Sequence, residues 1–181
     1  MFNKKNLTAY YFVDQIDEST ISTISKFNNV SLIYLNQNES ICNIQNLINI
    51  KKFCNKKNLK FYITNNIRLA IKLKANGVYL TKNYNGMLHN FKYKKDFLIL
   101  GSVHNQFEYY KKNIQNCKKF FLSPIFYNNK YSINKILGII RFKLLAKNWK
   151  NEVIPLGGIN QKNFNKANLV NKKFIAFRGW K

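Results

Sequence analysis

The chain has 181 residues, of which 46% are hydrophobic and 15% aromatic, which predicts one globular domain with a sizeable core. It carries 31 Lys and Arg residues but only 7 Asp and Glu, so its formal net charge is +24. So few carboxylates make a site built from clustered acidic side chains, such as an all-aspartate metal cage, hard to assemble.

The positive charge favours partners such as nucleic acid or an anionic membrane. Two features oppose this interpretation. The lysines are spread along the whole chain without a dense basic tail, and Asn, Lys, Ile, Tyr and Phe are jointly abundant, as in proteins from AT-rich genomes. We therefore favour a solvated lysine coat and regard nucleic acid as a poor candidate partner. A basic pocket for phosphorylated small molecules remains open as an alternative.

Cysteine usage and hydropathy indicate the compartment. Cys42, Cys54 and Cys117 are widely spaced and form no CxxC or CxxH pattern, so we expect neither a disulfide framework nor a zinc site. The N-terminal segment lacks the sustained apolar stretch of a signal peptide, and no run approaches the ~20 apolar residues of a membrane helix. We expect a soluble cytoplasmic protein that does not enter a membrane.

Short apolar runs alternate with stretches of helical periodicity along the chain. In the first half we expect a strand over 9–13, a helix over 19–27, a strand over 30–35, a helix over roughly 41–56, a strand over 59–64, a helix over 67–74 and a strand over 78–80. The helix ending at 74 is followed by Asn76-Gly77, a helix stop signal. Residues 83–95 show no clean pattern and are expected to form a loop.

The second half continues the alternation. It predicts a strand over 97–103, a helix over 106–116, a strand over 120–122, a polar loop over 127–135, a helix over 136–149, a strand over 153–156, a short helix over 163–170 and a strand over 173–177. Most of these strands are apolar on both faces, which is typical of a parallel sheet covered by helices.

Eight such units predict a single α/β domain over residues 1–181, a (β/α)8 TIM barrel that is compact because its length is below the usual range. The shortage shows in the weak pattern after the fourth strand and in the missing final helix after the eighth. An open, doubly wound sheet is the alternative fold, but no GxGxxG or GxxxxGK[ST] motif follows any strand.

In such a barrel, functional side chains lie at the C-terminal ends of the strands. Gly157 and Gly158 follow the seventh strand, where glycine lets backbone N–H groups approach a phosphate and a helix begins soon after. Arg178, just after the eighth strand, could add a bidentate clamp. Ser102 and His104 share one side of the fifth strand's end, which makes His104 a candidate general acid or base. The alternative for the glycine pair is a tight turn that binds no ligand. The alternative for His104 is a hydrogen-bonded histidine without a catalytic role.

Five segments in a fixed order resemble one known family. They are FYITNNIRLAI (61–71), ANGVYL (75–80), LGSVH (100–104), SPIF (123–126) and IPLGGI (154–159). Together they resemble the thiamine-phosphate synthase/TenI family of (β/α)8 barrels over about residues 9–178, nearly the whole chain. The resemblance implies one of two chemistries. Synthases join a pyrimidine pyrophosphate to a thiazole phosphate with Mg²⁺ on the pyrophosphate, whereas the TenI branch isomerises a thiazole phosphate carboxylate through a histidine.

The resemblance also assigns roles to particular residues. Ser102 and His104 match the family's serine and histidine after the fifth strand, and both branches can carry that histidine. Gly157 and Gly158 match the glycine pair that binds the thiazole phosphate. The family's loop after the sixth strand matches at 124–126, its threonines are replaced or lost, and its lysine falls on Lys130 with a one-residue gap.

The departures from the family concern the pyrimidine pyrophosphate and its metal. The family's substrate-binding Gln, Arg and Lys after the second strand fall on Tyr34, Asn36 and Asn38. Its metal carboxylate after the third strand falls on Asn65, and that after the fourth falls near Asn83 or Tyr84, with Lys82 beside it. Neutral amides replace anionic Mg²⁺ ligands poorly, so no cofactor is certain and Mg²⁺ requires a relocated site. Lys82 could supply positive charge in place of the metal.

Three activities are compatible with these residues. They are a divergent thiamine-phosphate synthase of thiamine biosynthesis, a TenI-like isomerase using His104, and a non-catalytic relative that binds a phosphorylated ligand. Because a missing final helix would leave an apolar flank of the barrel exposed, we also consider a homodimer.

Overall fold

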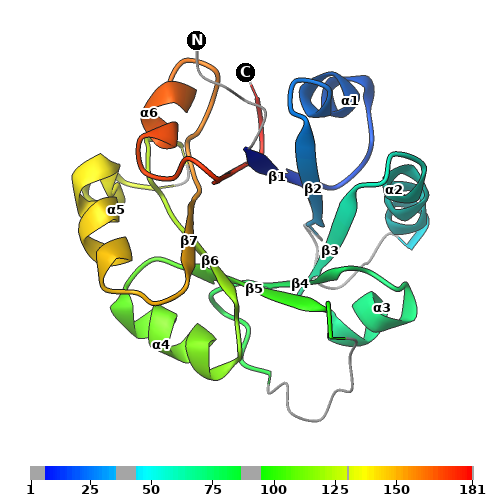
Figure 1. Cartoon of the computed structure of the whole chain (residues 1–181), viewed down its shortest axis with the longest axis horizontal. Coiled ribbons are helices and arrows are strands. Elements are labelled where there is room, and N and C mark those ends of the chain that lie inside the picture. Colours follow the sequence, from blue (N-terminus) through cyan, green and yellow to red (C-terminus); the bar gives the residue numbers. More distant parts are fainter. Residues whose placement is uncertain (1–6, 36–43, 87–94, 130, 181) are drawn as a thin grey trace.

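A computed structural model of the chain describes residues 7–35, 44–86, 95–129 and 131–180. Its eight strands form one parallel sheet in the order β7-β6-β5-β4-β3-β2-β1-β8, rolled into the ring of Figure 1. They are β1 (Thr8–Val13), β2 (Asn29–Tyr34), β3 (Lys60–Thr64), β4 (Gly77–Leu80), β5 (Leu98–Val103), β6 (Lys119–Leu122), β7 (Glu152–Pro155) and β8 (Phe174–Phe177). The expected TIM barrel is confirmed, and each strand end lies within one residue of its expected position.

The helices lie outside the ring (Figure 1). They are α1 (Glu18–Ile24), α2 (Ile44–Lys56), α3 (Ile67–Lys72), α4 (Gln106–Ile114), α5 (Gly138–Lys147) and α6 (Phe164–Asn168), with a 3-10 turn at Ile133–Lys135. Several begin at a side-chain cap; the Asn66 amide oxygen, for example, accepts from the Leu69 N–H of α3 at 2.9 Å. None of the helices in the described ranges is both long and apolar enough to cross a membrane.

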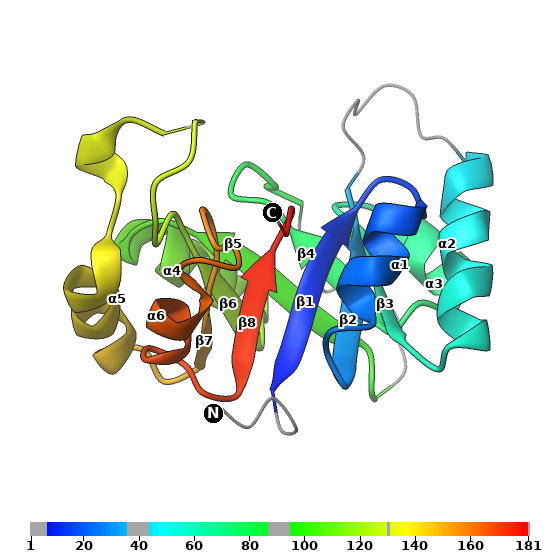
Figure 2. The ribbon, with the colours of Figure 1, turned by 90° about the horizontal axis from the view of Figure 1, so that it is seen from above.

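The barrel closes by pairing its first and last strands. Figure 2 shows β8 and β1 side by side, and their register pairs Thr8 with Phe174 and Tyr11 with Phe177. The two ends of the hydrogen-bonded sheet are therefore β7 and β8. The Asn171 side chain, just before β8, bridges this seam by donating from Nδ2 to the Val153 carbonyl of β7 at 2.8 Å.

The barrel interior is filled mainly by aromatic and branched side chains. Residues that point inward form a cluster separate from the larger core between strands and helices. Its members are Tyr10, Phe12, Ile33, Tyr62, Tyr79, Leu100, Phe121, Ile154 and Ala176. Phe121 lies at the centre of this cluster, with ring centroids 5.1 Å from Tyr10 and 5.3 Å from Tyr79 in edge-to-face geometry. This packed interior leaves ligands only the ends of the barrel.

The flank beside β8, expected to be exposed, is covered by the chain itself. Described residues 178–180 follow β8 without regular secondary structure. Instead the Trp180 ring packs against Phe27, Phe164 and Phe177, with centroid distances of 5.1, 5.3 and 4.8 Å. One indole therefore covers three phenylalanine rings on this flank.

Replacing this indole tests its role. Trp180→Ala removes a half-buried aromatic side chain and uncovers three phenylalanine rings, so we expect the free energy of unfolding to fall by about 2 kcal/mol. Urea denaturation followed by circular dichroism measures the change. Phe107→Ala, which removes an exposed ring of α4, is the control and should change the stability by less than about 0.5 kcal/mol. Equal effects of the two variants would contradict this role.

Candidate functional site

A cavity of about 910 Å³ opens at the C-terminal ends of the strands. Its walls bring together most of the side chains expected there: Lys82, Ser102, His104, Gly157, Gly158 and Arg178. A neighbouring hollow of about 690 Å³ lies between the ends of β3 and β4 and includes Asn65. Tyr34 lines neither cavity but is buried in the outer layer between strands and helices. Asn36, Asn38 and Lys130 lie outside the described residues.

His104 is held so that one ring nitrogen faces the cavity. The Glu108 carboxylate lies 2.8 Å from Nδ1 and also accepts from the His104 backbone N–H at 2.8 Å. Because an ionised carboxylate only accepts hydrogen bonds, Nδ1 carries a proton. The other ring nitrogen, Nε2, is then the one that can exchange a proton with a ligand. Nε2 lies 3.2 Å from the Ser123 hydroxyl and 3.3 Å from the Tyr131 hydroxyl. This arrangement is suited to moving a proton between the ring and a bound ligand.

Ser102 is engaged with the barrel interior. Its hydroxyl hydrogen-bonds Tyr79, whose pKa is raised above its ordinary value mainly by burial. Tyr79 also lines the cavity floor. Ser102 thus joins the packed interior to the mouth.

Gly157 and Gly158 form a tight loop with positive φ angles of 93° and 70°. A side chain at Gly157 would lie 2.9 Å from the Pro124 Cα, and one at Gly158 would collide with the carbonyl groups of Phe126 and Tyr127. The glycines therefore have a packing reason of their own. Within the described part of the chain neither glycine N–H has a hydrogen-bond acceptor, which leaves both able to bind an anion.

Asn163, which the sequence analysis did not single out, fixes this loop. Its side chain donates to the Gly158 carbonyl at 2.7 Å and accepts from the Asn160 N–H at 2.9 Å. The Gly158 carbonyl is therefore occupied by Asn163, whereas the N–H groups of Gly157 and Gly158 have no acceptor among the described residues. The helix expected over 163–170 is only the five-residue α6, so its dipole contributes little and the anion site rests on the loop itself.

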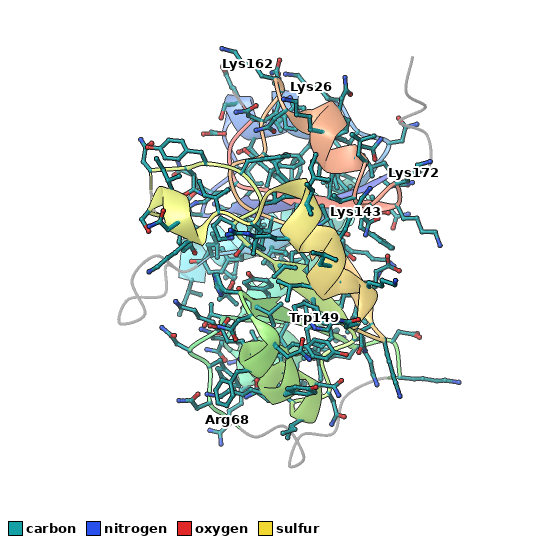
Figure 3. The ribbon with its side chains drawn as sticks, turned by 90° about the vertical axis from the view of Figure 1, so that its left-hand side faces the viewer. Lys26, Arg68, Lys143, Trp149, Lys162 and Lys172 are labelled. Carbon is teal, nitrogen blue, oxygen red and sulfur yellow. The ribbon has the colours of Figure 1, made fainter. Side chains whose placement is uncertain are left out.

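The electrostatics of the mouth favour anions. Lys82 and Arg178 line the larger cavity, and no carboxylate is among the described residues that line it. Elsewhere the lysines lie on many elements, as Figure 3 shows for Lys26 after α1, Lys143 on α5 and Lys172 before β8. The mouth therefore combines cations with free N–H donors, whereas the remaining charge is spread out.

The segment after β4 is anchored by a buried lysine. Lys112 of α4 has no exposed surface, and its Nζ donates to the Tyr84 carbonyl and the Gln115 side chain, both at 2.9 Å. Gln115 in turn donates to the carbonyls of Tyr84 and Gly86 at 3.1 and 3.0 Å. These bonds fix the stretch that follows Lys82. Local sequence carries no signal for this anchor, because Lys112 lies in a helix with several other polar residues.

The family model described as thiamine monophosphate synthase matches residues 19–179. The chain belongs to this family. Within it, the chain is 27% identical over 189 residues to the thiamine-phosphate synthase of Pelagibacter ubique (strain HTCC1062), an alignment that covers 98% of this chain and 91% of the relative.

Solved structures agree on the fold of this thiamine monophosphate synthase family member. The thiamine phosphate pyrophosphorylase of Pyrococcus furiosus superposes with a TM-score of 0.73 at 15% identity, covering 96% of this chain and 86% of the other. That of Bacteroides thetaiotaomicron gives 0.59 at 16% identity, covering 94% and 81%. The family resemblance expected from the motifs is thereby confirmed.

The buried anchor predicts a pH effect on stability. Burial lowers the Lys112 pKa from 10.5 to about 8, so above pH 8 the folded chain releases a proton that the unfolded chain keeps. Since the unfolded state then binds more protons, this residue raises stability as pH increases from 8 toward 10.5. Between pH 7 and 9, urea titrations should show wild type gaining about 1 kcal/mol relative to Lys112→Met.

Lys143→Met provides the control, because Lys143 lies at the outer surface (Figure 3). Its stability difference from wild type should not change between pH 7 and 9. Cys117, next to Lys112, has its pKa raised by burial to about 12 and stays protonated in the folded state over this range. A pH-independent gap between wild type and Lys112→Met would contradict the buried-charge interpretation.

Proposed function

We propose that the barrel mouth binds a thiazole phosphate and couples it to a pyrimidine pyrophosphate, which makes the chain a divergent thiamine-phosphate synthase. The observation that carries this proposal is the cavity of about 910 Å³ that combines the free N–H groups of Gly157 and Gly158 with Lys82 and Arg178. Membership of the family supports the same class of substrates.

The proposed reaction needs positioning more than proton transfer. The C–O bond between the pyrimidine's methylene carbon and pyrophosphate breaks, and the electron pair leaves with pyrophosphate. The thiazole nitrogen then donates its lone pair to the resulting carbocation and forms the new C–N bond. In this scheme Gly157 and Gly158 hold the thiazole phosphate, while Lys82 and Arg178 stabilise the negative charge of the leaving group.

An isomerase of the TenI type is the second candidate, and one observation favours it. The Glu108–His104 pair presents Nε2 to the cavity beside two hydroxyl groups, which suits His104 to remove and return a proton on a thiazole phosphate carboxylate. A non-catalytic relative that binds a phosphorylated ligand is the third candidate.

The proposal places the protein in the cytoplasm, where its small phosphorylated substrates would be found.

A homodimer also stays a prediction, but the surface on which we expect the two copies to meet is no longer the flank beside β8. Trp180 covers the flank beside β8, whereas exposed apolar side chains gather on α4 and α5, among them Ile114, Ile140 and Leu144. Light scattering on the purified chain measures its oligomeric state.

The deciding experiment mixes purified protein with the pyrimidine pyrophosphate and the thiazole phosphate, with and without Mg²⁺. Mass spectrometry then measures thiamine phosphate. We expect product above a no-enzyme control, and His104→Gln should retain at least a third of it because the coupling needs no proton acceptor at that position. No product from folded wild type, together with an isomerase activity abolished in His104→Gln, would establish the second candidate instead.

Binding of the thiazole phosphate can be tested separately. Gly157→Ala places a methyl group against Pro124 in the loop that would hold the phosphate, and we expect at least a tenfold loss of affinity by calorimetry. Gly138→Ala is the matched control, since Gly138 also has a positive φ, of 63°, but open space around it. Equal losses in the two variants, or none in either, would contradict a phosphate site at this loop.

A further inference from the structure

We infer that the mouth holds the pyrophosphate group with its own cations, chiefly Lys82, and that Mg²⁺ is not required for this binding. The inference rests on the proposed function, since it concerns the leaving group of that reaction. It departs from the Mg²⁺ that the family resemblance implies.

The donor set of the mouth does not fit Mg²⁺. This ion prefers oxygen ligands in octahedral geometry and is usually held by one or two carboxylates. The described residues that line either cavity include no Asp or Glu. The described parts of the chain also contain no group of three or more His, Cys, Asp and Glu placed to hold a metal.

Three carboxylates elsewhere are held in other contacts, and Asp14, which follows β1, lines neither cavity. Glu108 accepts two hydrogen bonds from His104, and Asp17 caps α1 through the Thr20 N–H at 2.7 Å. Glu152 lies at the opposite end of the barrel, at the start of β7, where Asn171 donates to it at 3.3 Å. None of these three groups can turn to the mouth without breaking these contacts.

The amide that stands where the family has a metal ligand is also occupied. The Asn65 side-chain oxygen accepts from the Thr81 backbone N–H at 2.9 Å, and its Nδ2 donates to the Thr81 hydroxyl at 2.9 Å. Asn65 has a positive φ of 56°, a conformation that asparagine adopts more readily than most residues. The amide therefore ties the end of β3 to the end of β4 instead of offering an oxygen to a cation.

The same pairing positions Lys82. Thr81 is fixed by Asn65 on one side, and the following stretch is fixed through Tyr84 by Lys112 and Gln115. Lys82 lies between these two anchors and lines the larger cavity together with Arg178 and the glycine loop. A lysine ammonium placed near a pyrophosphate supplies positive charge at the place where a carboxylate would have drawn in a metal ion.

Calorimetric titration with sodium pyrophosphate tests the inference on the full chain. We expect binding in EDTA, with an affinity that changes less than threefold when Mg²⁺ replaces EDTA. Lys82→Met should weaken binding about 10- to 100-fold, which is the usual size of a lost hydrogen bond to a charged group. Lys82→Arg retains the charge and should stay within about fivefold of wild type, and Lys143→Met should bind like wild type.

The outcomes separate this inference from the proposed function. Binding that appears only with Mg²⁺ would overturn the inference and leave the synthase proposal standing. Binding without Mg²⁺ that is unchanged in Lys82→Met, with circular dichroism showing a folded variant, would overturn the role of Lys82. If folded wild type binds neither pyrophosphate nor inorganic phosphate under any of these conditions, the proposed function fails as well.

Discussion

The filled barrel interior is the constraint on which the remaining structure depends. Because Phe121 packs edge-to-face with Tyr10 and Tyr79, the centre of the ring has no room for a ligand. Burial raises the pKa of the interior Tyr62 to about 12, so this hydroxyl stays neutral at any physiological pH. Binding groups must therefore come mainly from the strand ends and the loops that follow them, and Tyr79 and Ser102 connect these groups to the interior packing.

The sequence predicted the strands well because each is a short apolar run, buried on both faces, between recognisable turns. It also placed His104 and the glycine pair at the mouth, since strand order alone determines which loops meet there. The helices were less accurate. The helix expected over 136–149 is α5, which is two residues shorter at each end and starts at Gly138, a residue with a positive φ. The polar loop expected over 127–135 contains a 3-10 turn at Ile133–Lys135.

Residues that act through side-chain partners far along the chain gave no local signal. Asn163 and Lys112 are polar residues in polar stretches, and their roles appear only when the fold brings carbonyl groups to them. Trp180 likewise reads as a terminal aromatic residue until it is seen against Phe27, which lies 153 positions earlier in the chain. Periodicity reports which face of an element is buried, but it carries no information on such pairings.

The pairing of β1 with β8 has a consequence for how the chain folds. All other strand pairs of the sheet join neighbours in sequence, whereas this pair joins Thr8 to Phe174. The entropic cost of closing a loop grows with its length, and this entropy is lost before the new contacts form and compensate for it. The barrel is therefore expected to assemble from β1 through β7 by local steps and to close last. In that order of events, the last seven described residues, 174–180, determine whether the edge of β1 and the apolar surface beside it become covered.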